Sequence, residues 1–226
     1  MKKTTHLLLV AFCIAFVTLG YAQHKNYKIK NGIGLQGGVT QFDILTDNFE
    51  TKSNSGFIGG MTASVDIPHR WYNVSYNIQL SENNIDIHAA TPATSREEYI
   101  EYKMFTAQIA FLFHIKLISN NITLDVGPML QYNSELELKD DSKEGYLITG
   151  YDNLFTEDIT KISQFNANGA VGISAGFGSF LLRAQYVYGF TNILGKLNDQ
   201  DLNVGSNIDK FKGNQSLLAF TAMLIF

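Results

Sequence analysis

The chain has 226 residues and a formal net charge of −4, and this mildly acidic balance argues against a nucleic-acid partner. Three prolines, one tryptophan and the lack of any low-complexity tract indicate a single compact domain. A membrane-spanning helix needs roughly 20 consecutive apolar residues, and no segment after the N-terminal region is that long. The rest of the chain could therefore cross a bilayer only as β-strands.

Residues 1–22 have the layout of a secretory signal peptide. A positive "MKK" precedes a 13-residue apolar core, Leu7 to Leu19. The small residues Gly20 and Ala22 then occupy the −3 and −1 positions before Gln23. A spanning anchor would need roughly 20 apolar residues, so we expect cleavage instead.

The single cysteine, Cys13, lies inside this segment. A lipidated cysteine needs a small residue before it, and Phe12 is not small, so we expect no lipid anchor. The mature barrel domain, residues 23–226, would then have a net charge of −6, no disulfide and no thiol chemistry.

Eight segments alternate between apolar and polar residues, which predicts β-strands. They comprise residues 32–42, 56–67, 71–80, 105–117, 121–132, 165–177, 180–190 and 218–226. Most are about 10 to 13 residues long, close to the roughly 9–11 residues with which a tilted strand crosses a bilayer. The first segment slips phase between Val39 and Phe42, which predicts a β-bulge.

The connections between these segments alternate strictly in length. Short gaps at 68–70, 119–121 and 178–179 alternate with long gaps at 43–55, 82–98, 134–162 and 192–213. This order predicts an all-β fold, an eight-stranded antiparallel transmembrane up-and-down β-barrel of the outer membrane. The long loops would be extracellular and both termini periplasmic.

The composition of the two strand faces predicts which one meets lipid. The polar face carries Asn, Ser, Thr, Gln and Gly, not the Lys and Glu of a water-facing surface. The long gaps hold 26 of the 38 charged residues, with a net charge of −10. The apolar face should therefore meet lipid and the polar face should fill the lumen. The alternative is a secreted lipocalin-like barrel with an apolar pocket.

Lipid-facing aromatic residues should gather at the two interfaces of the bilayer. Those beside the short turns are Tyr72, Phe180 and Phe226, and those toward the long loops are Phe57, Phe105, Tyr132, Phe165, Tyr188 and Phe190. Glu101 and Lys103 share the phase of Phe105, so they should stand above the membrane on a projecting sheet. The period of two in "ELELK" (135–139) and "DITKIS" (158–163) predicts further strand there.

The segments "LDVGPMLQY" and "FLLRAQYVYGFTN", and a chain that stops on "TAMLIF", carry a family resemblance. With the Gly127-Pro128 pair and the glycine strand "GAVGISAGFG", the chain resembles the PorT-type outer-membrane β-barrel family, an architectural relative of the OmpA and OmpX barrels. The resemblance implies one accessory role, in protein export by a secretion system. It also implies that Phe220, Leu224 and Phe226 form a C-terminal signal that the barrel-insertion machinery reads.

No catalytic, cofactor or metal residue is predicted. The mature histidines, His24, His69, His88 and His114, show no metal-ligand spacing, and no local Ser-His or Cys-His arrangement is evident. An enzyme would need such groups to converge from separate strands. "DDSKEG" lacks the twelfth-position glutamate of a calcium loop, because Tyr151 stands there.

Four inward-phase ionisable residues should form a structural charge cluster near the short turns: Asp66, His114, Asp125 and Arg183. If residues 178–179 form the turn, Ser174 lies opposite Arg183, whose guanidinium should reach Asp125, Asp66 or both.

The sequence therefore predicts a non-enzymatic membrane-embedded scaffold with acidic surface loops. The alternatives are a lipid-modifying enzyme and a narrow pore. The expected partners are outer-membrane lipid, lipopolysaccharide bridged by divalent cations, the barrel-insertion machinery and secretion-system proteins. No cofactor and no nucleic acid is expected.

Overall fold

The computed structural model describes residues 30–226 except 67, 93, 95, 203 and 205–209, so the predicted signal peptide lies outside the described residues. The strands are β1 (Lys30–Thr46), β2 (Thr51–Asp66), β3 (Tyr72–Ala90), β4 (Glu97–Ile118), β5 (Ile122–Asn133), β6 (Glu137–Leu138), β7 (Leu147–Ile148), β8 (Phe165–Phe177), β9 (Phe180–Gly189) and β10 (Gly213–Ile225), and the 3₁₀ turns are η2 (Asp141–Lys143) and η3 (Gly195–Asp199).

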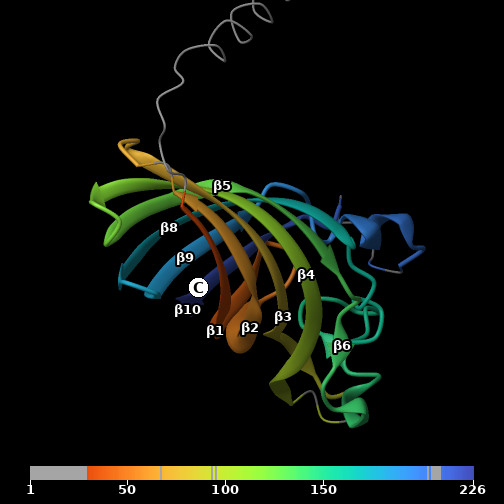
Figure 1. Ribbon diagram of the computed structural model, residues 1–226. Helices are drawn as coiled ribbons and strands as arrows, with labels where there is room; N and C mark the ends of the chain where they lie inside the picture. The colour runs from red at the N-terminus through yellow and green to blue at the C-terminus, as the bar shows by residue number, and fades with distance from the viewer. Residues whose placement is uncertain (1–29, 67, 93, 95, 203, 205–209) are drawn as a thin grey trace, which may run out of the picture.

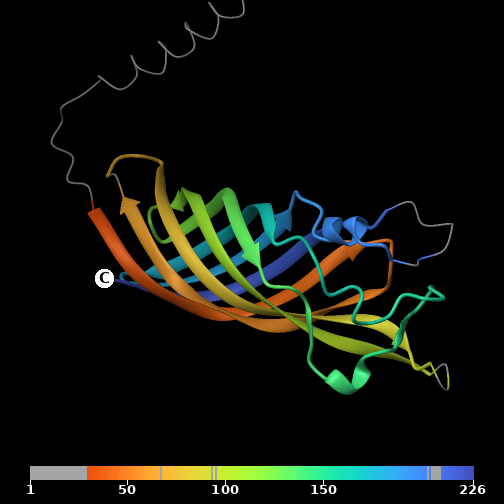
Figure 2. The ribbon, with the colours of Figure 1, turned by 90° about the vertical axis from the view of Figure 1, so that its right-hand side faces the viewer.

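Eight strands form a closed antiparallel ring in the order β1-β2-β3-β4-β5-β8-β9-β10 (Figures 1 and 2). The ring closes where β1 pairs with β10, from Gly34 opposite Ile225 to Thr46 opposite Gly213. The predicted eight-stranded up-and-down barrel is confirmed. Among the described residues no helix is long and apolar enough to span a membrane.

The three predicted short turns lie at the same end of the barrel as the C-terminus (Figure 2). Each turn contains one residue in the left-handed region: His69 (φ 69°), Ser119 (φ 51°) and Gly178 (φ 61°). Positive φ reverses the chain within two or three residues. We call this the short-turn end and the opposite one the loop end.

Along the middle of the barrel the apolar faces point outward and the polar faces inward. Ile78 and Leu80 of β3 are 61% and 65% exposed, whereas Asn77 and Gln79 between them are buried. Of the nine aromatic residues predicted to face lipid, eight are exposed and Tyr72 is half-buried, so their outward orientation is confirmed. Because these rings lie outside the barrel, the structure argues against the lipocalin-like alternative, which would place most of them inside.

Strands β1 to β4 are longer than the predicted 10 to 13 residues, with 17, 16, 19 and 22 residues. The β3–β4 hairpin consumes most of the predicted loop 82–98 and extends beyond the rest of the barrel at the loop end (Figure 2). His88, expected in a loop, therefore lies on β3. A strand that continues above the membrane can keep pairing there, because the pairing needs no lipid.

The two faces of the extended hairpin exchange character at one level. On the side of this level toward the short-turn end, the outward face is apolar and the inward face polar. On the side toward the loop end, the outward face is polar and the inward face apolar. The β4 residues that show this exchange face outward as Phe105, Lys103 and Glu101, and inward as Gln108, Thr106, Met104, Tyr102 and Ile100. Lys103 and Glu101 pair with Glu137 and Lys139, at 3.1 and 2.8 Å. The extension thus has the surface of a sheet in water.

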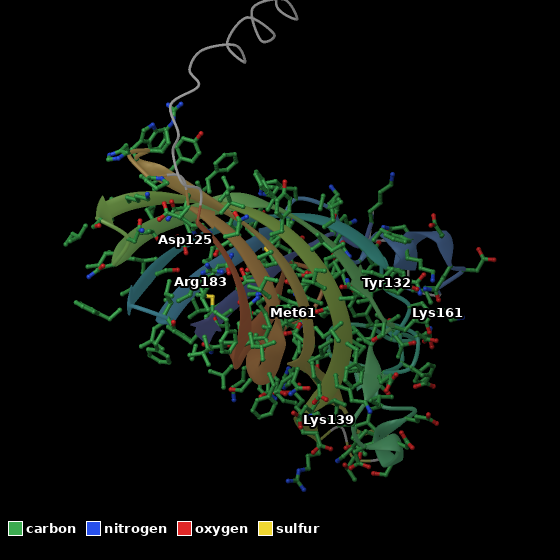
Figure 3. All side chains as sticks on the ribbon, in the orientation of Figure 1. Met61, Asp125, Tyr132, Lys139, Lys161 and Arg183 are labelled. Atoms are coloured by element: carbon green, nitrogen blue, oxygen red, sulfur yellow. The ribbon has the colours of Figure 1, made fainter. Side chains whose placement is uncertain are left out.

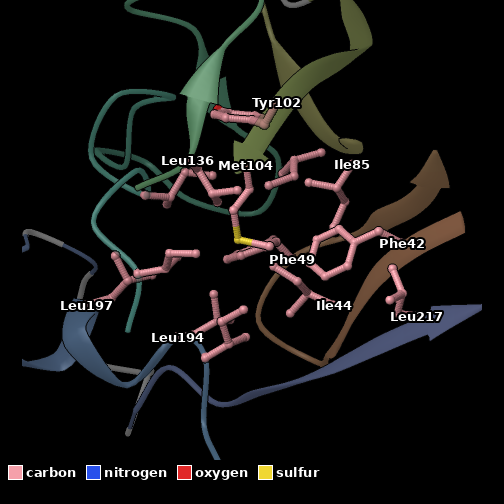
Figure 4. Close-up of a cluster of buried hydrophobic side chains, with 14 of the residues drawn as sticks. Phe42, Ile44, Phe49, Ile85, Tyr102, Met104, Leu136, Leu194, Leu197 and Leu217 are labelled. Carbon is pink, nitrogen blue, oxygen red and sulfur yellow. The ribbon is translucent and has the colours of Figure 1, made fainter. Parts of the chain in front are cut away.

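The inward apolar residues of the extension join the long loops in one hydrophobic core that fills the loop end (Figure 4). The strands contribute Phe42, Ile44, Ile85, Tyr102 and Met104, and the loops contribute Phe49, Leu136, Leu194 and Leu197, all buried. We call this cluster the cap core. It makes the long loops a packed layer over the barrel.

Two local predictions are wrong, and a third is confirmed only in part. The β1 register runs without a shift against both neighbours, and Phe42 simply points inward into the cap core. The bulge lies in β2 instead, between Ser53 and Phe57. Residues 158–163 form no strand, since their alternation reflects Ile159 and Ile162 packing into the cap core. In "ELELK" only Glu137–Leu138 is strand, pairing with β4.

Two glycines permit close approach of neighbouring backbones. A Cβ on Gly38 would lie 1.9 Å from the Phe220 carbonyl oxygen, and one on Gly127 would lie 1.9 Å from that of Phe111. Both contacts are far below any real Cβ distance, so only glycine allows the strands to coil this tightly there.

Candidate functional site

A buried ion pair lies in the lumen toward the short-turn end, with Arg183 Nε donating to Asp125 Oδ2 at 3.0 Å. The other Asp125 oxygen is 2.7 Å from His114 Nδ1. The structure therefore brings together three of the four predicted charge-cluster residues, from β9, β5 and β4. Ser174 lies opposite Arg183 as the predicted turn requires.

Asp66, the fourth residue, belongs to a separate pair nearer the mouth of the barrel. Its carboxylate accepts from Lys116 Nζ at 2.8 Å and from Asn120 Nδ2 at 2.7 Å. Lys116 lies two residues beyond His114 on β4 and also faces inward. It therefore takes the place that was predicted for Arg183 as the partner of Asp66. The lumen thus holds two neutralised ion pairs.

The carboxylate of Asp125 is fully buried and has hydrogen-bond partners on both oxygens. Besides Arg183 and His114, Thr123 Oγ1 donates to Oδ1 at 2.7 Å, and Ser174 Oγ contacts Oδ2. A buried carboxylate is tolerated only with such partners, because removing it from water is otherwise costly.

The network continues beyond the ion pair to a serine that sequence reasoning missed. His114 Nε2 lies 2.7 Å from Ser75 Oγ, and Ser75 Oγ accepts from Asn77 Nδ2 at 2.9 Å. Ser75, His114 and Asp125 come from the adjacent strands β3, β4 and β5, and all three side chains are buried. In the β3–β4 register Asn73 lies opposite His114, so Ser75 is the diagonal neighbour of His114. Only the exact register of β3 against β4 could have predicted this contact.

A cavity of about 330 Å³ lies between this network and the short-turn mouth. Ser75, His114 and Arg183 line it, together with an apolar wall of Leu181, Met223 and Ile225. Arg183 Nη1 is buried and has no hydrogen-bond partner among the described residues. The cavity is thus amphipathic and offers one unused donor.

Above the cavity the lumen is filled by hydrogen-bonded amides and hydroxyls, with buried apolar side chains such as Leu112 and Met129 between them. Gln131 bonds Gln215 across the barrel at 2.6 Å and accepts from Asn168 at 2.8 Å. Thr40 donates to Asn83 at 3.1 Å. The charge network, this amide layer and the cap core succeed one another from the short-turn end to the loop end. Figure 3 shows Asp125 and Arg183 at the short-turn end and Lys139 and Lys161 at the loop end.

The residues of the predicted C-terminal signal face outward on β10. Phe220, Leu224 and Phe226 are exposed, and the backbone N–H of Phe226 donates to Ile33 at 2.8 Å. The last residue is therefore held in the seam between β1 and β10, with its ring on the outer surface.

The loops show no grouping of metal ligands within the described residues. His88 lies 3.5 Å from Glu50 through Nδ1 and 3.9 Å from Glu97 through Nε2. In "DDSKEG" Asp140 caps the 3₁₀ turn η2, accepting from the N–H and hydroxyl of Ser142. His69 lies in a short turn, and His24 lies outside the described residues.

Closed ring, apolar outer belt and polar filled lumen together define an eight-stranded transmembrane β-barrel of the outer-membrane type. The structure is similar to that of Neisserial surface protein A (NspA), with a TM-score of 0.50 and 12% identity, over 88% of this chain and 99% of that one. The attachment invasion locus protein Ail of Yersinia pestis aligns with 10% identity over 87% and 99% of the two chains, at a TM-score of 0.40.

No protein-family model and no curated protein sequence matches the chain. The PorT-type resemblance therefore stays a prediction. At 12% identity the likeness to NspA shows the fold alone.

Proposed function

We propose that the protein is an outer-membrane barrel whose extracellular role is non-enzymatic: it is a membrane-embedded scaffold that presents a rigid acidic surface outside the cell. The observation that carries this proposal is the cap core, which packs the long loops onto the extended strands. Loops ordered in this way present fixed side chains to a partner, as binding loops on rigid scaffolds do. The structural likeness to NspA supports a membrane barrel.

In the proposed orientation the loop end is extracellular and the short-turn end, with both termini, is periplasmic. The outer belt meets lipid, and divalent cations bridge the acidic loops to lipopolysaccharide phosphates. The barrel-insertion machinery reads Phe220, Leu224 and Phe226, whose side chains all lie on the outer face. An accessory role in protein export is the finer proposal that the PorT-type resemblance supports.

The pore alternative is disfavoured by the filled lumen, since eight strands enclose only enough room for side chains. Planar-bilayer recording should therefore give conductance near zero, and large steady currents would overturn the scaffold proposal. The lipid-modifying alternative needs reactive groups at the lipid-facing surface, whereas Ser75 and His114 lie inside the barrel. Lipid-hydrolysis assays on the purified barrel should show no turnover.

Cysteine labelling in intact cells tests the orientation. We would introduce Glu144→Cys in a loop or Ser179→Cys in a short turn into the mature chain, which has no cysteine of its own. A membrane-impermeant maleimide should label the first in intact cells and the second only after the outer membrane is permeabilised. Labelling of the short turn alone would reverse the orientation. Crosslinking from the loop position, followed by pull-down, would then identify the partner.

A further inference from the structure

Ser75, His114 and Asp125 have the geometry of an acyl-transfer triad. The two distances that define it, Oγ to Nε2 and Nδ1 to Oδ1, are both 2.7 Å. This is the reach required between a nucleophile, its base and the group that orients the base.

The surrounding hydrogen bonds are compatible with the polarity that a nucleophilic serine requires, which we assign from the partners of each atom. Asn77 donates to Ser75 Oγ, which leaves the Ser75 hydroxyl proton to point at His114 Nε2. Asp125 is an acceptor for the opposite ring nitrogen, so the neutral imidazole carries its proton on Nδ1 and its lone pair on Nε2. In this tautomer His114 can receive the Ser75 proton.

Two members of the triad border the cavity at the short-turn mouth, although Ser75 is only 1% and His114 only 8% exposed. Ser75 and His114 both line the 330 Å³ cavity, and so does Arg183, whose buried Nη1 lacks a partner among the described residues. The backbone N–H groups around Ser75 belong to the β-ladder, so a donor for a developing oxyanion must come from a side chain. Arg183 supplies that donor, and Leu181, Met223 and Ile225 give the substrate an apolar wall.

We propose that this cavity is a second functional site, independent of the extracellular role, that hydrolyses small carboxylic esters entering from the short-turn side. Ser75 Oγ bonds to the carbonyl carbon while its proton passes to His114 Nε2 and the carbonyl electron pair moves onto oxygen. When the ester C–O bond breaks, the alcohol leaves with the proton from His114. Water then attacks the acyl-Ser75, giving its proton to His114, and the freed Ser75 Oγ takes that proton back as the carboxylic acid leaves.

The test is covalent labelling of the full mature barrel, refolded in detergent, with diisopropyl fluorophosphate. Mass spectrometry should find the adduct on the peptide that contains Ser75. Wild-type protein alone decides this outcome, so it does not depend on how well a variant folds. An adduct at another residue, or none on folded barrel, would overturn the proposal.

Hydrolysis of p-nitrophenyl acetate provides the second measurement. Ser75→Ala and His114→Gln should each lower the rate at least about 10²-fold, the usual loss for a nucleophile or its base. The matched control is Ser81→Ala, since Ser81 is also buried on the inward face of β3 but bonds Thr106 and no histidine. It should hydrolyse the ester as wild type does, whereas equal loss in Ser81→Ala would show a merely structural effect.

Discussion

Glu82 of β3 and Phe105 of β4 are direct cross-strand partners on the outer face of the barrel. Toward the short-turn end the next outward residues are Leu80 and Ala107, and toward the loop end they are Asn84 and Lys103. The pair therefore marks the level at which the outer surface changes from apolar to charged. Charge on a lipid face costs roughly 2–4 kcal/mol at mid-bilayer for a base, so the membrane should end here.

Cysteine accessibility in lipid nanodiscs should locate this boundary. Asp86→Cys and Glu101→Cys, which are cross-strand partners above it, should react readily with a water-soluble maleimide. Ile78→Cys and Ile109→Cys, partners below it, should stay unreactive until detergent replaces the lipid. Equal reactivity at both levels would show that the outer belt does not meet lipid.

Replacing Arg183 with Met should lower the unfolding temperature of the purified barrel. Removing one partner of a buried pair costs roughly 3–5 kcal/mol, because Asp125 would stay charged and buried without its guanidinium. Adding Asp125→Leu to Arg183→Met should recover part of the loss, which a double-mutant cycle measures. Conductance should stay near zero in both variants, because the amide layer and cap core still fill the lumen. Additive losses would argue against the pair.

Gly38→Ala should impair barrel folding strongly, whereas Gly37→Ala should not. A Cβ at position 38 meets the Phe220 carbonyl oxygen at 1.9 Å, while one at position 37 finds its nearest neighbour, the Ile58 oxygen, at 3.9 Å. We expect a loss of about 1–3 kcal/mol or more for the first and a change within about 0.5 kcal/mol for the second. Urea-unfolding curves of the two refolded variants would give both values. Similar stabilities would contradict the close approach of β1 and β10.

Met104→Ala should loosen the loop cap and leave the barrel intact. Met104 is fully buried in the cap core, and removing such a side chain costs about 2–5 kcal/mol. Limited proteolysis should then cut the segment 134–162 faster, while the heat-modifiable band of the barrel persists. Phe105→Ala, one residue away but outward-facing, is the control and should leave the cutting rate unchanged.

Glu98 and Lys143 clamp η2 to the extended hairpin through a 2.6 Å hydrogen bond. This bond from Lys143 lowers the pKa of Glu98 below its ordinary value. The clamp is therefore complete above the ordinary glutamate range, and weakens as the pH falls through the lowered pKa. A carboxyl-carbon NMR titration should show the Glu98 midpoint rise in Lys143→Met. It should not move in Lys139→Met, where the lost partner is Glu101.

The membrane-crossing part of the fold was predictable, since a period of two, applied to residues such as Tyr76 and Ile78, separates lipid from lumen wherever those are the two environments. The same rule failed at Phe42. Above the membrane the outer environment is water, so the apolar phase moves from the outward to the inward face. Phe42 therefore broke the apolar-outward pattern without any shift in strand register, because at its level the apolar residues face inward. Glu82 and Asp86, in phase with Leu80, carried the signal of this change.

The charge cluster was predictable only in part. Ser174 and Arg183 share a level because one short turn fixes the β8–β9 register, and that turn is visible as Gly178-Ser179. Asp125 reaches the same level through the pairing of β5 with β8. The partners of Asp66 and Ser75 could not be assigned, because they depend on the exact strand register and on how far the side chains of Lys116 and His114 reach toward β2 and β3. Such convergence follows from pairing and coiling of the whole sheet, which no local pattern records.

The seam between β1 and β10 sets the order in which the molecule can be made. Its two edges come from opposite ends of the chain, so no intermediate that lacks the C-terminal strand can be a closed cylinder. Such a chain would expose unpaired edges on β1 and β9, the situation that leads to aggregation. Contacts so distant in sequence also form slowly. The chain must therefore be complete before the barrel can close and enter the membrane. A chain that lacks only β10 should fail to form a stable barrel at all.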